Sequence, residues 1–189
     1  EQIMFSTPSD WHEDDIERQL YVIRRKIENA ILAERIMEFY LCSFSVRSVI
    51  YKGMFLAEQV SDFYPDLKDE RFISRFAVYH QRYSTNTFPT WKLAQPFRVL
   101  AHNGEINTFR GNQNWMSCHE DRMALPAFGD DVEHLKPVIQ GGSSDSAALD
   151  AVFELLLHGE RDLPMVKTMM VPEATGDDVR QDLKNLYGY

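Results

Sequence analysis

The sequence is poor in several features that would narrow its function. It has two cysteines, Cys42 and Cys118, which are too few for a disulfide framework and lack metal-ligand spacing, so a reducing compartment is expected. Its 20 Lys and Arg residues against 29 Asp and Glu give a net charge of −9, which argues against a surface that follows nucleic-acid phosphates. No apolar run approaches the roughly 20 residues that span a bilayer, and no signal-peptide pattern is present.

The remaining composition is that of one ordinary globular domain. Hydrophobic residues make up 44% of the chain and charged residues 26%, as in soluble proteins generally. A chain of 189 residues can bury a sizeable core as a single unit. Because no internal repeat, low-complexity segment or linker is present, the sequence predicts one domain over residues 1–189 and no second domain.

The hydrophobic pattern predicts an α/β protein. Strands are expected at short segments rich in aromatic and β-branched residues, namely 39–44, 46–52, 76–80, 97–102 and 166–171. Helices are expected over residues 10–38, 54–63, 107–124, 146–158 and about 179–186.

The first of these helices has the clearest pattern. Asp10 and Glu13 have the spacing of a capping pair at its start. Five aliphatic residues follow at helical spacing: Ile16, Leu20, Ile23, Ile27 and Ile31. Three charged residues on the other side are expected to face solvent: Arg24, Arg25 and Glu28.

Three short polar motifs stand where a predicted strand ends or a predicted helix begins. They are the segments 80–85 (HQRYST), 101–105 (AHNGE) and 143–146 (SSDS). Together they supply a cation, a turn able to bind an anion, and a carboxylate. A site with those parts can hold a small zwitterion, such as an amino acid, and stabilise an oxyanion beside it.

Each motif also has a purely structural interpretation. Arg82 can clamp a carboxylate with its planar fork of donors, or make a surface salt bridge. Asn103-Gly104 can form a hairpin turn, or point a side-chain amide and a backbone N–H at a developing negative charge. His102 can act as a base, although a structural role is more common at the end of a strand. Asp145 can accept an ammonium group, or belong to the N-terminal cap of the following helix.

The combination and order of these motifs resemble the glutaminase domain of the class II (N-terminal nucleophile) glutamine amidotransferases. Within that group the sequence is similar to the large subunits of glutamate synthases, for which the segment 80–91 (HQRYSTNTFPTW) is specific. Further similar segments are 40–43, 51–54, 101–108, 112–116, 143–150 and 169–173. The resemblance covers nearly all of the chain.

The resemblance implies a role for each motif. Arg82 matches the residue that holds the α-carboxylate of glutamine, with Thr85 helping beside it. Asp145 matches the carboxylate that accepts the α-amino group. Asn103, through its side-chain amide, and Gly104, through its backbone N–H, match the oxyanion hole. The implied fold is an N-terminal-nucleophile-type four-layer α/β/β/α sandwich, of which this chain would hold a part.

The nucleophile of that family has no counterpart in this sequence. It is a cysteine at the N-terminus of the mature protein, and its thiol attacks the amide to form a thioester that water hydrolyses. Residue 1 here is Glu1, while Cys42 and Cys118 lie within the chain and are expected to be structural. The chain therefore resembles the later portion of the domain, and we expect no glutaminase activity from it alone.

The resemblance also implies a larger parent enzyme, which hydrolyses glutamine and uses the ammonia to aminate 2-oxoglutarate reductively to glutamate. FMN and an iron–sulfur cluster are implied for that parent, and no cofactor or metal for this segment. The implied partners are glutamine or glutamate and the remainder of the large subunit. Exposed edges of an incomplete sheet predict a homo-oligomer. The expected location is the cytoplasm, or a plastid in a photosynthetic eukaryote.

A second hypothesis is a non-catalytic relative of the same fold, acting as a sensor of glutamine or glutamate or as an interaction module. A Cys-Gly start in the coding sequence upstream of Glu1 would favour the enzyme over this alternative.

Overall fold

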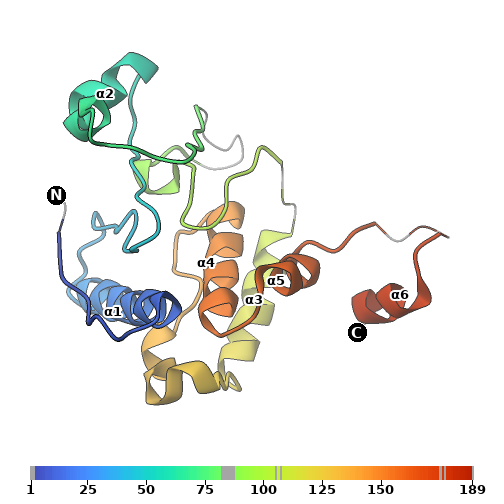
Figure 1. Cartoon of the computed structure of the whole chain (residues 1–189). Coiled ribbons are helices and arrows are strands. Elements are labelled where there is room, and N and C mark those ends of the chain that lie inside the picture. The colour runs from blue at the N-terminus through green and yellow to red at the C-terminus, as the bar shows by residue number, and fades with distance from the viewer. Residues whose placement is uncertain are drawn as a thin grey trace.

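Helices and irregular segments make up the part of the chain that the computed structural model describes, which is residues 3–81, 88–104, 106, 108–174, 176 and 178–188. The α-helices, labelled in Figure 1, are α1 (Glu13–Ala33), α2 (Val60–Phe63), α3 (Phe109–Glu120), α4 (Asp145–His158), α5 (Leu163–Met170) and α6 (Gln181–Gly188). The 3-10 helices are η1 (Ala57–Gln59), η2 (Pro65–Lys68), η3 (Trp91–Leu93) and η4 (Pro126–Leu135). No helix of the described residues has the length and apolar character needed to cross a membrane.

The expected α/β/β/α sandwich is wrong for this structure, because the described residues contain no β-strand. The segments 39–44, 46–52, 76–80 and 97–102 are irregular, and residues 166–170 belong to a helix, α5. Without a sheet in this part of the chain, the homo-oligomer expected from exposed sheet edges has no structural basis here.

Side chains satisfy backbone groups that a neighbouring strand would otherwise pair. Glu17 of α1 accepts the N–H of Val46 at 2.7 Å through its Oε1. The Ser43 hydroxyl oxygen accepts the N–H of Ile50 at 3.1 Å. β-Branched and aromatic residues favour an extended chain, but a strand forms only when another strand lies beside it to complete the hydrogen bonds. In the described residues these segments have no such partner, and they remain irregular.

The expected helices are confirmed where the apolar spacing is strongest. Residues 107–124 contain α3, residues 146–158 coincide with α4 apart from its first residue, and residues 179–186 overlap α6. Residues 54–63 hold η1 and α2 in place of one continuous helix.

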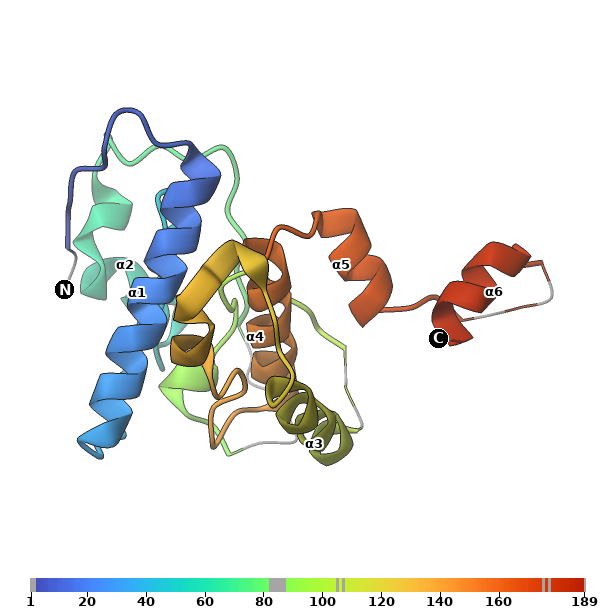
Figure 2. The ribbon, with the colours of Figure 1, turned by 90° about the horizontal axis from the view of Figure 1, so that it is seen from below.

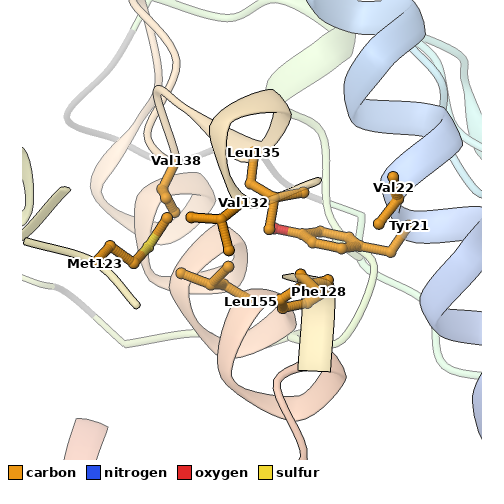
Figure 3. Close-up of a cluster of buried hydrophobic side chains, with 8 residues drawn as sticks. All are labelled: Tyr21, Val22, Met123, Phe128, Val132, Leu135, Val138 and Leu155. Carbon is orange, nitrogen blue, oxygen red and sulfur yellow. The ribbon is translucent and has the colours of Figure 1, made fainter. Parts of the chain in front are cut away.

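The hydrophobic core lies where α1, η4 and α4 meet (Figure 2). Figure 3 shows its main cluster, in which side chains from these elements and from the segments beside η4 and α3 converge. Its members are Tyr21, Val22, Met123, Phe128, Val132, Leu135, Val138 and Leu155. By contrast, α6 lies apart from this core in both ribbon views, and none of its residues is buried.

The start and end of α1 differ from the sequence expectation. Its N-cap is His12, whose Nδ1 accepts the N–H of Asp14 at 3.3 Å, so the capping pair expected at Asp10 and Glu13 is wrong. The helix ends at Ala33, five residues before the expected position at Glu38.

The buried face of α1 also differs from the expectation. Arg24, Arg25 and Glu28, expected to face solvent, are 3%, 4% and 8% exposed. Ile23 and Ile27, expected inside, are 43% and 36% exposed. The helical period was correct. Which face of the helix is buried, however, depends on the side chains of the neighbouring elements, and here those side chains are charged.

These partners form one buried network of ion pairs between α1 and α4. Arg24 bonds Glu28 at 2.8 Å and Glu154 of α4 at 2.5 Å. Arg25 and Arg98 bond the same Glu28 at 2.8 and 3.1 Å. Burial alone would raise the pKa of Glu28, but the three guanidinium groups outweigh it and hold that pKa below its ordinary value. Glu28 therefore stays charged in the folded protein although it is buried.

Replacing Arg24 by Met should destabilise the chain strongly, because Glu28 and Glu154 would lose a partner while they remain buried. We expect a loss of about 3–5 kcal/mol in the free energy of unfolding, measured by urea denaturation followed by circular dichroism. Arg71→Met is the control. Arg71 pairs with Asp69 at the surface, so its loss should leave the urea midpoint of unfolding unchanged. Equal shifts for the two variants would contradict a structural role for the buried network.

Candidate functional site

Two of the three sequence motifs, apart from Glu105, lie in the described part of the structure. Arg82 and Thr85, the candidate partners of a carboxylate, lie outside the described residues. Asn103 and Gly104 are exposed in the irregular segment that precedes α3. Asp145 is the half-buried first residue of α4. The structure thus gives positions for the candidate oxyanion turn and for the candidate ammonium acceptor.

The sequence around Asp145 starts α4 by local capping. The hydroxyl oxygen of Ser144 accepts the N–H of Ala147 at 3.1 Å, which satisfies one of the free N–H groups of the first turn. Asp145 Oδ1 accepts the N–H of Ser146 at 2.6 Å. A carboxylate in the first turn is also favoured by the helix dipole. The structural interpretation of this motif is therefore correct, and it fixes the Asp145 carboxylate at the end of a helix.

Asp150, further along α4, holds the backbone that leads to the Asn103–Gly104 turn. Its Oδ1 accepts the N–H groups of Val99 and Leu100, each at 2.9 Å. Its Oδ2 accepts the N–H of Arg98 at 3.2 Å. Asp150 is only 2% exposed, so these bonds are well shielded from water. The carboxylate fixes the segment against α4 where a neighbouring strand was expected to do so.

His102 joins the turn to the start of α4. Its Nε2 lies 2.7 Å from the hydroxyl oxygen of Ser146, which is itself buried. Its Nδ1 accepts the N–H of Gly104 at 3.1 Å, and its own N–H donates to Gln95 Oε1 at 2.9 Å. Two motif residues 44 positions apart in the chain are thereby brought into hydrogen-bond contact.

The proton positions in this contact follow from the partners. Because Nδ1 accepts from Gly104, the neutral ring carries its proton on Nε2 and donates it to Ser146. The Ser146 hydroxyl is then free to donate to Asp145 Oδ1, 3.2 Å away. His102 is thus a donor toward Ser146, which favours its structural interpretation over that of a base.

Sequence reasoning missed most of the residues that build this region. The signal available was a polar stripe at a spacing of four on the otherwise apolar helix α4, formed by Ser146, Asp150 and Glu154. All three are buried, and each meets a different part of the molecule. Polar residues that recur on a buried helix face indicate partners on other elements, because their burial without hydrogen bonds is costly.

Lys52 is a second buried charge that the sequence analysis did not single out. Its Nζ donates to the carbonyl oxygens of Lys92 and Ala94 at 2.8 and 3.1 Å. It also lies 4.4 Å from the centre of the Tyr40 ring and 5.0 Å from that of Phe97. Burial lowers the pKa of Lys52 to about 8. These contacts tie Lys52 to residues 92–97, the segment that leads to His102.

The two cysteines lie in different surroundings. Cys42 is half-buried in an irregular segment, and burial raises the pKa of its thiol, so less of the reactive thiolate forms. Cys118 is exposed on α3. Neither cysteine takes part in the hydrogen bonds described above for His102 and Asp145.

A cleft of about 770 Å³ lies between the first half of α1, residues 43–50 and the end of α4. Its lining includes charged side chains such as Glu17, Arg18 and Arg161. In the described part of the chain this lining does not include Asn103 or Asp145. Among the described candidate residues, the cleft therefore involves neither the oxyanion turn nor the ammonium acceptor.

A family model described as glutamine amidotransferases class-II matches the sequence over residues 1–189, the whole chain. The chain belongs to the class II glutamine amidotransferases. The resemblance seen in the sequence is thereby confirmed, although the described residues lack the sheets expected of the family.

Curated relatives of this amidotransferase chain are glutamate synthases. The glutamate synthase [NADPH] large chain of Azospirillum brasilense is 62% identical over 92% of this chain and 12% of the relative. The glutamate synthase [NADH] of Saccharomyces cerevisiae is 46% identical over 95% of this chain and 8% of the relative. The chloroplastic ferredoxin-dependent glutamate synthase of Oryza sativa is 45% identical over 92% of this chain and 11% of the relative. The chain thus spans only about a tenth of the length of these relatives.

The pH dependence of stability should depend on Asp150. Burial and the nearby Glu154 raise the pKa of Asp150 to about 6, from 3.8 for an ordinary aspartate, although the backbone N–H groups oppose this rise. The folded protein therefore holds the proton more tightly than the unfolded chain between these pH values, and the free energy of unfolding should fall as pH rises through that range.

Asp150→Asn removes this titration. Urea denaturation between pH 4 and pH 7 should show that the wild type loses on the order of 2–3 kcal/mol relative to Asp150→Asn across that interval. Asp131→Asn, at a more exposed pair with Lys26, is the control and should follow the wild-type curve. Parallel curves for the wild type and Asp150→Asn would show that the buried carboxyl does not titrate in this range.

Proposed function

We propose that these 189 residues are the later portion of a class II glutaminase domain within a glutamate synthase. The parent protein hydrolyses glutamine to glutamate and ammonia, and uses the ammonia in the reductive amination of 2-oxoglutarate. Membership of the amidotransferase family supports the first step. The names of the relatives, all glutamate synthases with different electron donors, support the second.

The roles of the motif residues follow from the chemistry of glutamine. Arg82, assisted by Thr85, binds the α-carboxylate, and Asp145 accepts hydrogen bonds from the α-ammonium group. Asn103 and Gly104 donate to the oxygen of the side-chain amide as it becomes an oxyanion. The observation that carries this proposal is the hydrogen-bonded contact between the segment of Gly104 and the start of α4. It brings the group for the ammonium close to the donors for the oxyanion.

The thiol that attacks the amide is proposed to lie outside these 189 residues. Cys42 and Cys118 are the only cysteines of the sequence. Burial raises the pKa of the Cys42 thiol, which makes it a weak nucleophile at neutral pH, and Cys118 lies on the surface of α3.

The redox groups of the parent are assigned to other parts of that protein. An iron–sulfur cluster needs about four cysteine ligands, and two cysteines, one on α3 and one in an irregular segment, do not fit it. FMN would supply the electrons for reductive amination in the parent, and no step of that reaction is assigned to the residues described here. The proposed setting is the cytoplasm, or a plastid for a relative of the chloroplastic enzymes.

Substitutions in the full-length protein that contains this chain test the site. Asp145→Asn should raise KM for glutamine at least tenfold, because the α-ammonium group loses its charged partner. Asn103→Ala should lower kcat for glutamine hydrolysis by about 10²–10³-fold, because the donor acts on charge that develops in the transition state. Glutamate release is the measurement, and Asp131→Asn at the surface is the control. Unchanged kinetics in both site variants would refute the assignment and favour a non-catalytic glutamine-binding module.

The position of the nucleophile has a test of its own. Cys42→Ser and Cys118→Ser in the full-length protein should each retain glutamine hydrolysis within about twofold of the wild type, because neither thiol attacks the substrate. Loss of glutamine hydrolysis in either variant, with folding intact by circular dichroism, would place the nucleophile in this chain.

A further inference from the structure

The hydrogen bonds around His102 link the two ends of the proposed glutamine site. We propose that His102 is a positioning residue that couples the Gly104 oxyanion donor to the Asp145 carboxylate through the hydroxyl of Ser146. This inference rests on the proposed function, because it assigns no new substrate and concerns how the same site is held. It adds two residues, His102 and Ser146, that act through others and do not touch glutamine themselves.

The path consists of three hydrogen bonds in sequence. The N–H of Gly104 donates to His102 Nδ1 at 3.1 Å. His102 Nε2–H donates to the Ser146 hydroxyl oxygen at 2.7 Å, and that hydroxyl donates to Asp145 Oδ1 at 3.2 Å. Each bond leaves the next group only one way to orient its proton, so the donors along the path point in one direction.

The contact between His102 and Ser146 is not needed to form either element that it joins. Ser144 already caps α4, and Asp150 already holds the backbone N–H groups of residues 98–100. Ser146 is nevertheless 5% exposed and uses its hydroxyl for this path alone among the bonds described. What the contact adds is a fixed relation between the turn and the carboxylate.

Binding of the substrate would act on both ends of the path. An ammonium group at Asp145 competes with the Ser146 hydroxyl for the carboxylate oxygen. The developing oxyanion competes with His102 Nδ1 for the Gly104 N–H. Because the two competing sites share one chain of hydrogen bonds, occupation of the ammonium site should change how readily Gly104 serves the transition state.

Glutaramate, which is glutamine without the α-amino group, separates the two ends. In the full-length protein, Ser146→Ala breaks the path in its middle while leaving Gly104 and Asp145 in place. We expect it to lower kcat for glutamine about tenfold, and to change kcat for glutaramate by less than about twofold. A purely structural role would affect both substrates alike.

Substitutions of His102 test each half of the path. His102→Asn can still accept from Gly104 but cannot reach Ser146, and His102→Gln can still donate to Ser146 through its amide. Both should lower kcat for glutamine to about the level of Ser146→Ala. Combining either with Ser146→Ala should cause little further loss, because the same path is already broken.

Ser74→Ala is the matched control, since it removes an exposed hydroxyl that bonds the carbonyl of Phe76, and the kinetics with both substrates should be unaffected. Thermal unfolding checks that each variant is folded, and His102→Gln remains informative if Ser146→Ala is not. Equal losses with the two substrates, additive losses in the combined variants, or a change confined to KM would each overturn the coupling. Asp145→Asn would still raise KM for glutamine in that event, so failure of the coupling is distinguishable from failure of the proposed function.

Discussion

The buried carboxylate of Asp150 is the contact on which the arrangement of the site depends. It accepts three successive backbone N–H groups of residues 98–100 and thereby holds that segment against α4. A carboxylate in the interior is costly, and the three N–H donors with Arg98 nearby offset part of that cost, although burial still leaves the pKa of Asp150 raised. The fixed segment continues directly into His102 and the Asn103–Gly104 turn. A single side chain therefore fixes the backbone that leads to the candidate oxyanion donors against the helix that carries Asp145.

Three polar residues on successive turns of α4 each contact a different part of the molecule. Ser146 contacts His102, Asp150 holds the segment before it, and Glu154 bonds Arg24 in the ion network with α1. Residues four apart lie on the same face of a helix. The same face of α4 therefore contacts both α1 and the candidate site, and it fixes the position of one relative to the other. The core and the site are built on the same surface of α4. This arrangement explains why charged residues occupy positions that an amphipathic pattern would assign to aliphatic ones.

Membership of the class II amidotransferases and the absence of strands in the described residues are separate findings. The motifs that carry the family signature are local, and their residue types can be read without knowing how the chain pairs. A sheet is not local, since each strand requires hydrogen bonds from another strand. Side chains such as Glu17, Ser43 and Asp150 take up some of these groups here. The family assignment therefore does not depend on a sheet within these residues.

The sequence by itself determined the family, the candidate site residues, and the helices with strong apolar spacing, such as α4, because these are properties of residue type and of short-range order. It did not determine which face of α1 is buried, because the period of the helix is the same whether Ile27 or Glu28 points inward. Only the tertiary structure decided that, by placing Glu154 and Arg98 where charged residues of α1 could pair with them. It likewise decided that His102 meets Ser146. Contacts between residues far apart in the chain depend on packing, which no local pattern encodes.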